Sequence, residues 1–208
     1  MGGMLIVNGK NYENPGFTLQ KSIVGFVQEL NDDRLFFAPN FSTLFSSKFK
    51  KGLIGQSVYP NTDKGTGNVT LNNLIQSGVG VSLLNHSENR IDFKIIKKVL
   101  EESNGFKIVL CAESLSEVKK FSKLSPFKIA YEPPELIGGD VSVSSSKPKI
   151  IQRAVLAYPE LLVGAGVKTV EDVKKCLELG AKGVLVSSGV MKTNDPGFLI
   201  KNFLEVLK

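Results

Sequence analysis

Residues 161–186 read LLVGAGVKTVEDVKKCLELGAKGVLV and outline two strands joined by a helix. The first strand is the apolar run 161–164, which ends in a glycine-rich turn, and the second is the run 184–186. Thr169 and Asp172 have the spacing of a capping box, which marks a helix start. One apolar face follows at three- and four-residue spacing, formed by Val170, Val173 and Leu177. This stretch therefore predicts a β-α-β unit.

Short apolar runs rich in β-branched residues recur along the whole chain, separated by amphipathic segments. They occupy residues 5–7, 35–38, 53–55, 79–84, 108–111, 127–131, 161–164 and 184–186. Other helix starts carry capping residues, at Ser114 with Glu117 and at Asp195 followed by Pro196. The runs show little period-2 alternation, which is typical of strands covered on both faces.

Strand and helix alternate eight times without a linker rich in proline, glycine or serine, so we predict one α/β domain over residues 1–208. The expected fold is a closed parallel (β/α)8 barrel, or TIM barrel. Such barrels have about 250 residues, so this one would be compact with shortened loops. A doubly wound open sheet is the alternative, because alternation alone does not show closure. No strand is followed by the G-x-G-x-x-G turn of a dinucleotide site, which disfavours it.

Composition is that of a globular domain, with 42% hydrophobic and 22% charged residues. No window approaches the ~18 apolar residues of a membrane helix, and we expect neither a membrane span nor an export signal. Residues 1–3, before Met4, are expected to be a short extension or a tag remnant. Cys111 and Cys176 are too few for a disulfide framework, so we expect a reducing cytoplasm.

The net charge of +6 and the pI of about 9.2 would fit a nucleic-acid partner, an anionic substrate or a lysine-rich surface. Lysine pairs at 97–98, 119–120 and 174–175 lie on amphipathic segments, which favours solvated helix faces. The sequence has neither a zinc-ligand cysteine spacing nor an aromatic-basic RNA signature. We therefore expect no nucleic-acid partner.

In a (β/α)8 barrel the active site lies at the carboxyl ends of the strands. Lys10, His86 and Glu132 each follow an apolar run closely and would converge on one mouth. Singly, they have ordinary explanations as a strand-end lysine, a structural histidine and a solvated carboxylate. Their joint placement favours catalysis.

Phosphate is the expected ligand of the last two strand ends. Barrels often bind phosphate with the loops after strands 7 and 8, using bare backbone N–H groups. The glycines here are Gly164, Gly166 and Gly189, and Ser187 and Ser188 would be additional donors. Tight turns without a ligand are the alternative explanation for these glycines.

Three strand-end motifs resemble the triosephosphate isomerase family, in particular its short archaeal form. They are Asn8-x-Lys10, Asn85-His86-Ser87-Glu88 and Ala130-Tyr131-Glu132-Pro133-Pro134-Glu135-Leu136-Ile137-Gly138. The glycine turns are similar to the archaeal phosphate loops, at Gly164-Ala165-Gly166-Val167 and Ser188-Gly189-Val190-Met191-Lys192. The matches run in order from residue 5 to residue 196.

The resemblance implies interconversion of glyceraldehyde 3-phosphate and dihydroxyacetone phosphate in glycolysis and gluconeogenesis. It implies that Glu132 moves the proton, that a neutral His86 polarises the carbonyl, and that Lys10 binds substrate and steadies the enediolate. Phosphate-contacting or neighbouring positions would be Asn8, Ile137, Gly138, Gly166, Ser187 and Ser188. Ser87 and Glu88 suit a helix start, whose positive end would lower the pKa of His86. This chemistry requires no metal or organic cofactor, and we predict none.

The resemblance also implies a lid after Glu132, entered through Pro133-Pro134 and hinged at Gly138-Gly139. Gly139-Asp140 stands where the family has threonine and glycine. The loop 56–69 resembles an arm that inserts into a neighbouring subunit, with its tip at Thr66-Gly67, so we predict a homodimer, with a tetramer left open. Asn68 and Asn89 replace an acidic residue and an arginine that pair across the family's dimer.

Other functions are weighed against this one. A ribulose-phosphate epimerase or a histidine- or tryptophan-pathway isomerase would share the barrel, but such enzymes often use metal ligands or an aspartate pair. A binding protein for DNA or RNA would leave the placement of Lys10, His86 and Glu132 unexplained. Cys111 resembles a cysteine that the family keeps at the end of its fifth strand, and it also fits a small buried core residue.

Overall fold

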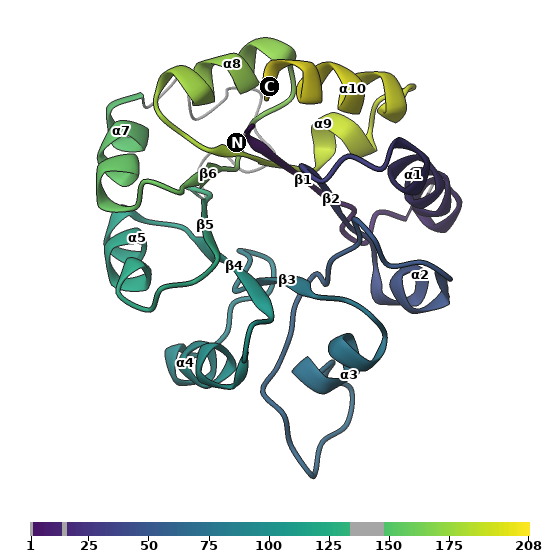
Figure 1. The fold of residues 1–208 in the computed structure, drawn as a ribbon. Helices are drawn as coiled ribbons and strands as arrows, with labels where there is room; N and C mark the ends of the chain where they lie inside the picture. The colour runs from purple at the N-terminus through teal and green to yellow at the C-terminus, as the bar shows by residue number, and fades with distance from the viewer. Residues whose placement is uncertain (1, 14–15, 134–147) are drawn as a thin grey trace.

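In the computed structural model, parallel strands form a ring that is surrounded by helices (Figure 1). The structure describes residues 2–13, 16–133 and 148–208. Within these residues seven strands form one sheet in the order β2-β1-β7-β6-β5-β4-β3. Their bounds are β1 (Met4–Asn8), β2 (Leu35–Ala38), β3 (Val81–Leu84), β4 (Lys107–Ala112), β5 (Lys128–Tyr131), β6 (Leu162–Val163) and β7 (Gly183–Val186).

Residues 53–55, the third apolar run, close the ring between β2 and β3. Leu53 makes a parallel bridge with Phe37 of β2, and Gly55 makes one with Ser82 of β3. The amide of Ile54 donates to the Phe37 carbonyl at 2.9 Å, and the carbonyl of Gly55 accepts from Leu83 at 2.9 Å. The predicted closed barrel is therefore confirmed, and the open sheet is excluded. The eighth position is held by two isolated bridges instead of a full strand.

The helices of the described residues pack around the outside of the barrel (Figure 1). Their bounds are α1 (Gly16–Leu30), α2 (Phe41–Ser46), α3 (Leu71–Gln76), α4 (Phe93–Glu102), α5 (Leu115–Ser122), α7 (Pro148–Ala157), α8 (Val170–Glu178), α9 (Ser188–Met191) and α10 (Pro196–Val206). No helix among the described residues is long and apolar enough to cross a membrane.

The three predicted helix caps are present. Thr169 and Asp172 form a reciprocal capping box at α8, and Asp195 caps α10 with Pro196 in its first turn. The Ser114 hydroxyl accepts from the amide of Glu117, but the Glu117 carboxylate accepts from the amide of Glu113 at 3.0 Å, not from Ser114. Caps of this kind typically stabilise a helix by ~1 kcal/mol.

Both faces of the barrel wall are apolar, which explains the weak alternation along the strands. The outer face packs against the helices, whereas a separate cluster fills the barrel interior. The interior cluster consists of Ile6, Ala38, Ile54, Leu83, Val109, Cys111, Ala130, Leu162 and Leu185. Full burial of each large aliphatic side chain contributes roughly 1.5–3 kcal/mol. The filled interior makes the barrel a rigid support for the loops at its carboxyl end.

Gly183 allows β7 to lie directly against β1. Its φ is +147°, and a Cβ there would lie 2.0 Å from the Met4 carbonyl oxygen. We expect Gly183→Ala to lower the free energy of unfolding by about 3 kcal/mol or more, because it must break the β1–β7 pairing. Chemical denaturation followed by circular dichroism at fixed protein concentration measures this loss.

Gly25→Ala is the matched control. Gly25 lies on the exposed face of α1, where an added Cβ meets nothing within 4 Å. This change should stabilise the protein by roughly 0.5–1 kcal/mol through helix propensity. Equal stability of Gly183→Ala and wild type would contradict the close contact between β1 and β7.

Candidate active site

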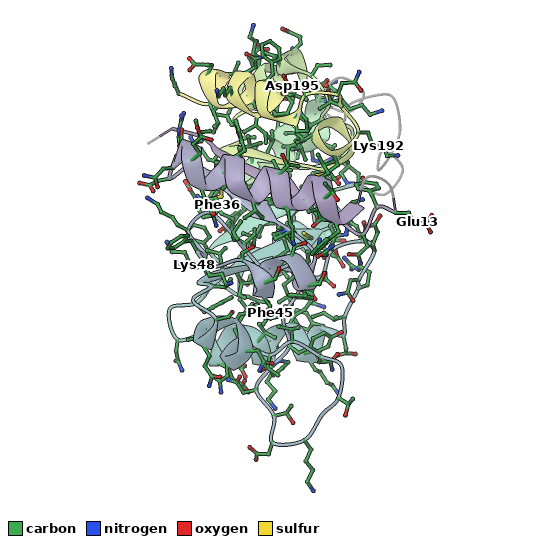
Figure 2. The ribbon with its side chains drawn as sticks, turned by 90° about the vertical axis from the view of Figure 1, so that its right-hand side faces the viewer. Glu13, Phe36, Phe45, Lys48, Lys192 and Asp195 are labelled. Atoms are coloured by element: carbon green, nitrogen blue, oxygen red, sulfur yellow. The ribbon has the colours of Figure 1, made fainter. Side chains whose placement is uncertain are left out.

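A cavity of about 700 Å³ opens at the carboxyl ends of the strands. Figure 2, a side view of the barrel, shows Glu13 and Lys192 at this end and Lys48 at the other. The predicted residues that line the cavity are Asn8, Lys10, His86, Glu132, Gly166, Ser187 and Ser188. Ile137, Gly138 and the pair Gly139-Asp140 lie outside the described residues. Strand ends far apart in the sequence thus meet in one place.

Glu132 follows β5 and is only 6% exposed. Its amide donates to the Ala112 carbonyl at 2.8 Å, and its side chain lies against bare Gly164, where an added Cβ would be 2.5 Å from its Cγ. Oε1 lies 3.5 Å from Nε2 of His86, while Oε2 has no hydrogen-bond partner within the described part of the chain. A buried carboxylate oxygen without a donor is costly, and such groups concentrate at functional sites.

The buried thiol of Cys111 adjoins Glu132 from the strand β4. Burial raises the pKa of this thiol well above 9.0, and the negative charge of Glu132 raises it further. The thiol therefore stays neutral beside the carboxylate. Cys111 and Cys176 are both buried, and neither forms a disulfide within the described residues.

His86 lies in a tight turn after β3, and the expected helix start at Ser87 is wrong. The next helix, α4, begins only at Phe93. Asn85, with φ +63°, shapes the turn: its amide group donates to the Cys111 carbonyl, and its Oδ1 accepts from the amide of Ile91. The turn directs the amide of Glu88 to Nδ1 of His86 at 3.1 Å. The donor to His86 is thus a single backbone N–H in a turn, and not the N-terminus of a helix as predicted.

The hydrogen bond at Nδ1 decides the tautomer of the neutral His86 ring. Since Nδ1 accepts a proton donor, the ring proton is on Nε2, which faces Glu132. Burial lowers the pKa of His86, whereas the hydrogen bond and charge of Glu132 raise it, and the net shift is upward from 6.5. The predicted net lowering is therefore wrong. Protonation at Nδ1 would forfeit the bond from Glu88, which opposes the upward shift.

Lys10 adopts a left-handed backbone conformation in the loop after β1, with φ +45°. For a non-glycine residue this costs roughly 1–2 kcal/mol, so the surrounding structure must impose it. Asn8 contributes by accepting the Lys10 amide on its Oδ1 at 3.0 Å. The ammonium of Lys10 donates to Glu88 Oε1 at 2.8 Å. Glu88, which the sequence reasoning did not select, therefore contacts both Lys10 and His86.

Tyr12 is a second cavity residue that the sequence reasoning missed, although it lies two residues beyond Lys10. Ser187 Oγ donates to the Asn8 carbonyl at 2.7 Å, which uses its only proton. At the 3.0 Å contact between Tyr12 Oη and Ser187 Oγ, Tyr12 must therefore be the donor. Lys192 lies over the Tyr12 ring, 5.3 Å from its centroid. This chain of contacts ties the loop after β1 to the loop after β7.

The glycine turns after β6 and β7 form the wall opposite Lys10. Ala165 and Gly166 both have left-handed φ, at +71° and +72°. At Gly189 an added Cβ would lie 2.9 Å from Lys168 Cα, so the two loops fit together only without a side chain. The first N–H groups of α9, which begins at Ser188, have no acceptor inside the helix. With Lys168 and Lys192 in the lining, this wall suits an anion.

No group of three or more histidine, cysteine or acidic side chains in the described ranges is arranged to hold an ion.

Comparison with known proteins identifies relatives along almost the whole chain. The model of the triosephosphate isomerase family matches residues 3–207. The triosephosphate isomerase of Thermoplasma volcanium is 44% identical over 204 residues, covering 92% of this chain and 94% of the relative. That of Cenarchaeum symbiosum is 40% identical over 156 residues, covering 70% of each chain. That of Methanobrevibacter smithii is 35% identical over 153 residues, covering 69% of each.

The single histidine of the chain makes the pairing with Glu132 directly measurable. We expect Glu132→Gln to lower the pKa of His86, because the burial that lowers it then acts without the charge of Glu132, and Glu88 alone opposes it. Titration of the one imidazole resonance by NMR gives the pKa before and after the change. Glu113→Gln is the control, since Glu113 pairs with Arg90 and should leave His86 unaffected. An equal or higher pKa in Glu132→Gln would contradict the described contact.

Proposed function

The chain belongs to the triosephosphate isomerase family, and we propose that it interconverts D-glyceraldehyde 3-phosphate and dihydroxyacetone phosphate through an enediolate. This places it in glycolysis and gluconeogenesis. The observation that carries the proposal is the pairing at 3.5 Å of a buried Glu132 carboxylate with Nε2 of His86. Both line one cavity with Lys10.

Glu132 is the base in this proposal. Its buried carboxylate removes the proton from the carbon next to the substrate carbonyl, and the C–H electron pair forms the new C=C bond as the carbonyl oxygen gains negative charge. His86 donates a hydrogen bond to that oxygen from Nε2, and the Lys10 ammonium stabilises the charge. The hydroxyl on the carbon that lost its hydrogen then gives its proton to the former carbonyl oxygen through His86, and its oxygen becomes the new carbonyl as the C=C electron pair takes the proton from Glu132 at the adjacent carbon. Both proton transfers are internal to the complex, so the reaction needs no external reactant.

The substrate phosphate is assigned to the wall built by the loops after β6 and β7. Gly166 and Ser188 would offer backbone N–H groups, and Asn8 and Ser187 would hold the neighbouring loops in place. The left-handed turn at Gly166 and the close fit at Gly189 support this assignment. Ile137 and Gly138 would complete the phosphate site from the lid. Closure over the site would exclude water and limit loss of phosphate from the enediolate.

We also propose that the protein is a homodimer in the cytoplasm. The arm that begins at Gln56 leaves the barrel before α3 (Figure 1), and its exposed tip carries Thr66 and Gly67. A second cavity, of about 460 Å³, lies beside Lys10 and is lined partly by Phe41 and Asn89. The tip of a second copy would enter this cavity and contact the loop that carries Lys10.

Glu132→Asp tests the role of the base. The shorter side chain withdraws the carboxylate from the reacting carbon while the phosphate contacts persist, so kcat should fall roughly 100-fold with little change in KM. A coupled assay with dihydroxyacetone phosphate measures both constants. Glu113→Asp, another strand-end glutamate outside the cavity, should behave as wild type. Absence of turnover by the pure wild-type enzyme would refute the proposed function.

Thr66→Arg tests the dimer. A charged side chain at the arm tip should not fit the second cavity, so sedimentation velocity should shift from twice the 22.6 kDa chain mass toward the monomer. Thr18→Arg is the matched control, because Thr18 is exposed on α1. If the wild type sediments as a monomer, or if Thr66→Arg stays dimeric, the arm does not form the interface.

A further inference from the structure

Gln20 is a polar side chain buried completely on the inner face of α1. Its Nε2 donates to the carbonyl of Lys10 at 3.0 Å and lies 3.4 Å from the carbonyl of Gly9. Its Oε1 accepts from the amide of Asn40 at 2.6 Å. Both polar atoms of this buried amide thus bond to the loops after β1 and β2.

Gly9 explains why a glutamine fits here. A Cβ at this position would lie 3.1 Å from Gln20 Oε1 and 3.0 Å from the Ala38 carbonyl. The space beside the strand end is therefore occupied by the Gln20 amide instead of a side chain at position 9. A buried amide is stable only when its hydrogen bonds are satisfied, so its geometry is tightly defined.

The carbonyl of Lys10 is the group that Gln20 fixes most directly. Lys10 has a left-handed backbone, with φ +45°, and the direction of its carbonyl follows from that conformation. Gln56 also reaches this carbonyl, but at 3.3 Å, and it divides its Nε2 between Ala38 and Asn8 as well. Gln20 therefore makes the shorter and less divided contact.

We propose that Gln20 is a positioning residue, which holds the Lys10 backbone in its left-handed turn and thereby places the Lys10 ammonium in the cavity. The proposal rests on the function assigned above to Lys10. Without the Gln20 donor, the Lys10 peptide can rotate toward an ordinary conformation, which moves the origin of the side chain. Helix α1 and the loop after β2 thus become part of the support for the substrate-binding cation.

Gln20→Met is the main test, because methionine keeps the length of the side chain and removes the donor and the acceptor. We expect kcat/KM to fall roughly 10- to 100-fold, with KM raised as well as kcat lowered, because Lys10 acts in both binding and reaction. Gln28→Met is the matched control. Gln28 lies on the same helix and donates to the Phe49 carbonyl at 2.8 Å, away from the cavity. It should leave both constants unchanged.

Gln20→Glu tests the donor itself and serves if Gln20→Met does not fold. The glutamate can still accept from Asn40, but its second oxygen faces two carbonyls and can donate only when the carboxyl is protonated. Burial beside carbonyls raises the pKa of a carboxyl group. Its kcat/KM relative to wild type should therefore recover as pH falls, whereas Gln20→Met should show no recovery. Equal impairment of both variants at every pH would overturn the proposal.

Amide hydrogen exchange at Lys10 separates this inference from the proposed function. The Lys10 amide is protected by Asn8 Oδ1, and the carbonyl of the same peptide unit, that of Gly9, lies 3.4 Å from Gln20 Nε2. Exchange should be faster in Gln20→Met and unchanged in Gln28→Met, whatever the substrate is. If wild type turns over triose phosphate but exchange and kcat/KM in Gln20→Met match the control, the positioning role is wrong and the function stands.

Discussion

Closure of the parallel backbone ladder is the constraint on which the rest of the structure depends. Every buried N–H and C=O group of a strand needs a partner, so an open parallel sheet would leave two unpaired edges at β2 and β3. Residues 53–55 supply both missing sets of hydrogen bonds. Once the ring is closed, all the carboxyl ends face the same mouth. The convergence of Lys10, His86 and Glu132 follows from closure and does not require separate interactions among them.

Glycines determine how closely the loops and side chains of the site approach one another. Gly164 leaves room for the Glu132 side chain, and Gly189 lets the loop after β7 lie against Lys168. Gly9 has the same effect beside Gln20. At each position a Cβ would lie within about 3 Å of an atom of the site, which is inside van der Waals contact. These glycines contribute no functional group themselves. Each one leaves the space that a side chain or loop of the site occupies.

Features set by short-range pattern could be predicted from the sequence. The alternating apolar runs predicted the barrel, and the capping residues predicted the helix starts. The residues that follow the strands predicted the lining of the cavity. The turn at His86 could not be predicted, because Ser87 and Glu88 suit a helix start locally. Asn85 overrides that preference through hydrogen bonds to the backbones of Cys111 and Ile91. No local pattern in the sequence indicates either of these bonds. The buried position of Gln20 could not be predicted either, because a glutamine on an amphipathic helix is normally exposed to solvent.

In the cavity, the Lys10 ammonium pairs with Glu88 and not with Glu132, the carboxylate that we propose as the base. Lys10 bonds to Glu88 at 2.8 Å, and Glu132 instead faces the Nε2 of His86 at 3.5 Å. Glu88 contributes two groups to this arrangement: its carboxylate accepts from Lys10, and its amide donates to Nδ1 of His86. Glu88 thus links the Lys10 ammonium to the His86 ring, and in the proposed reaction it orients both groups beside Glu132.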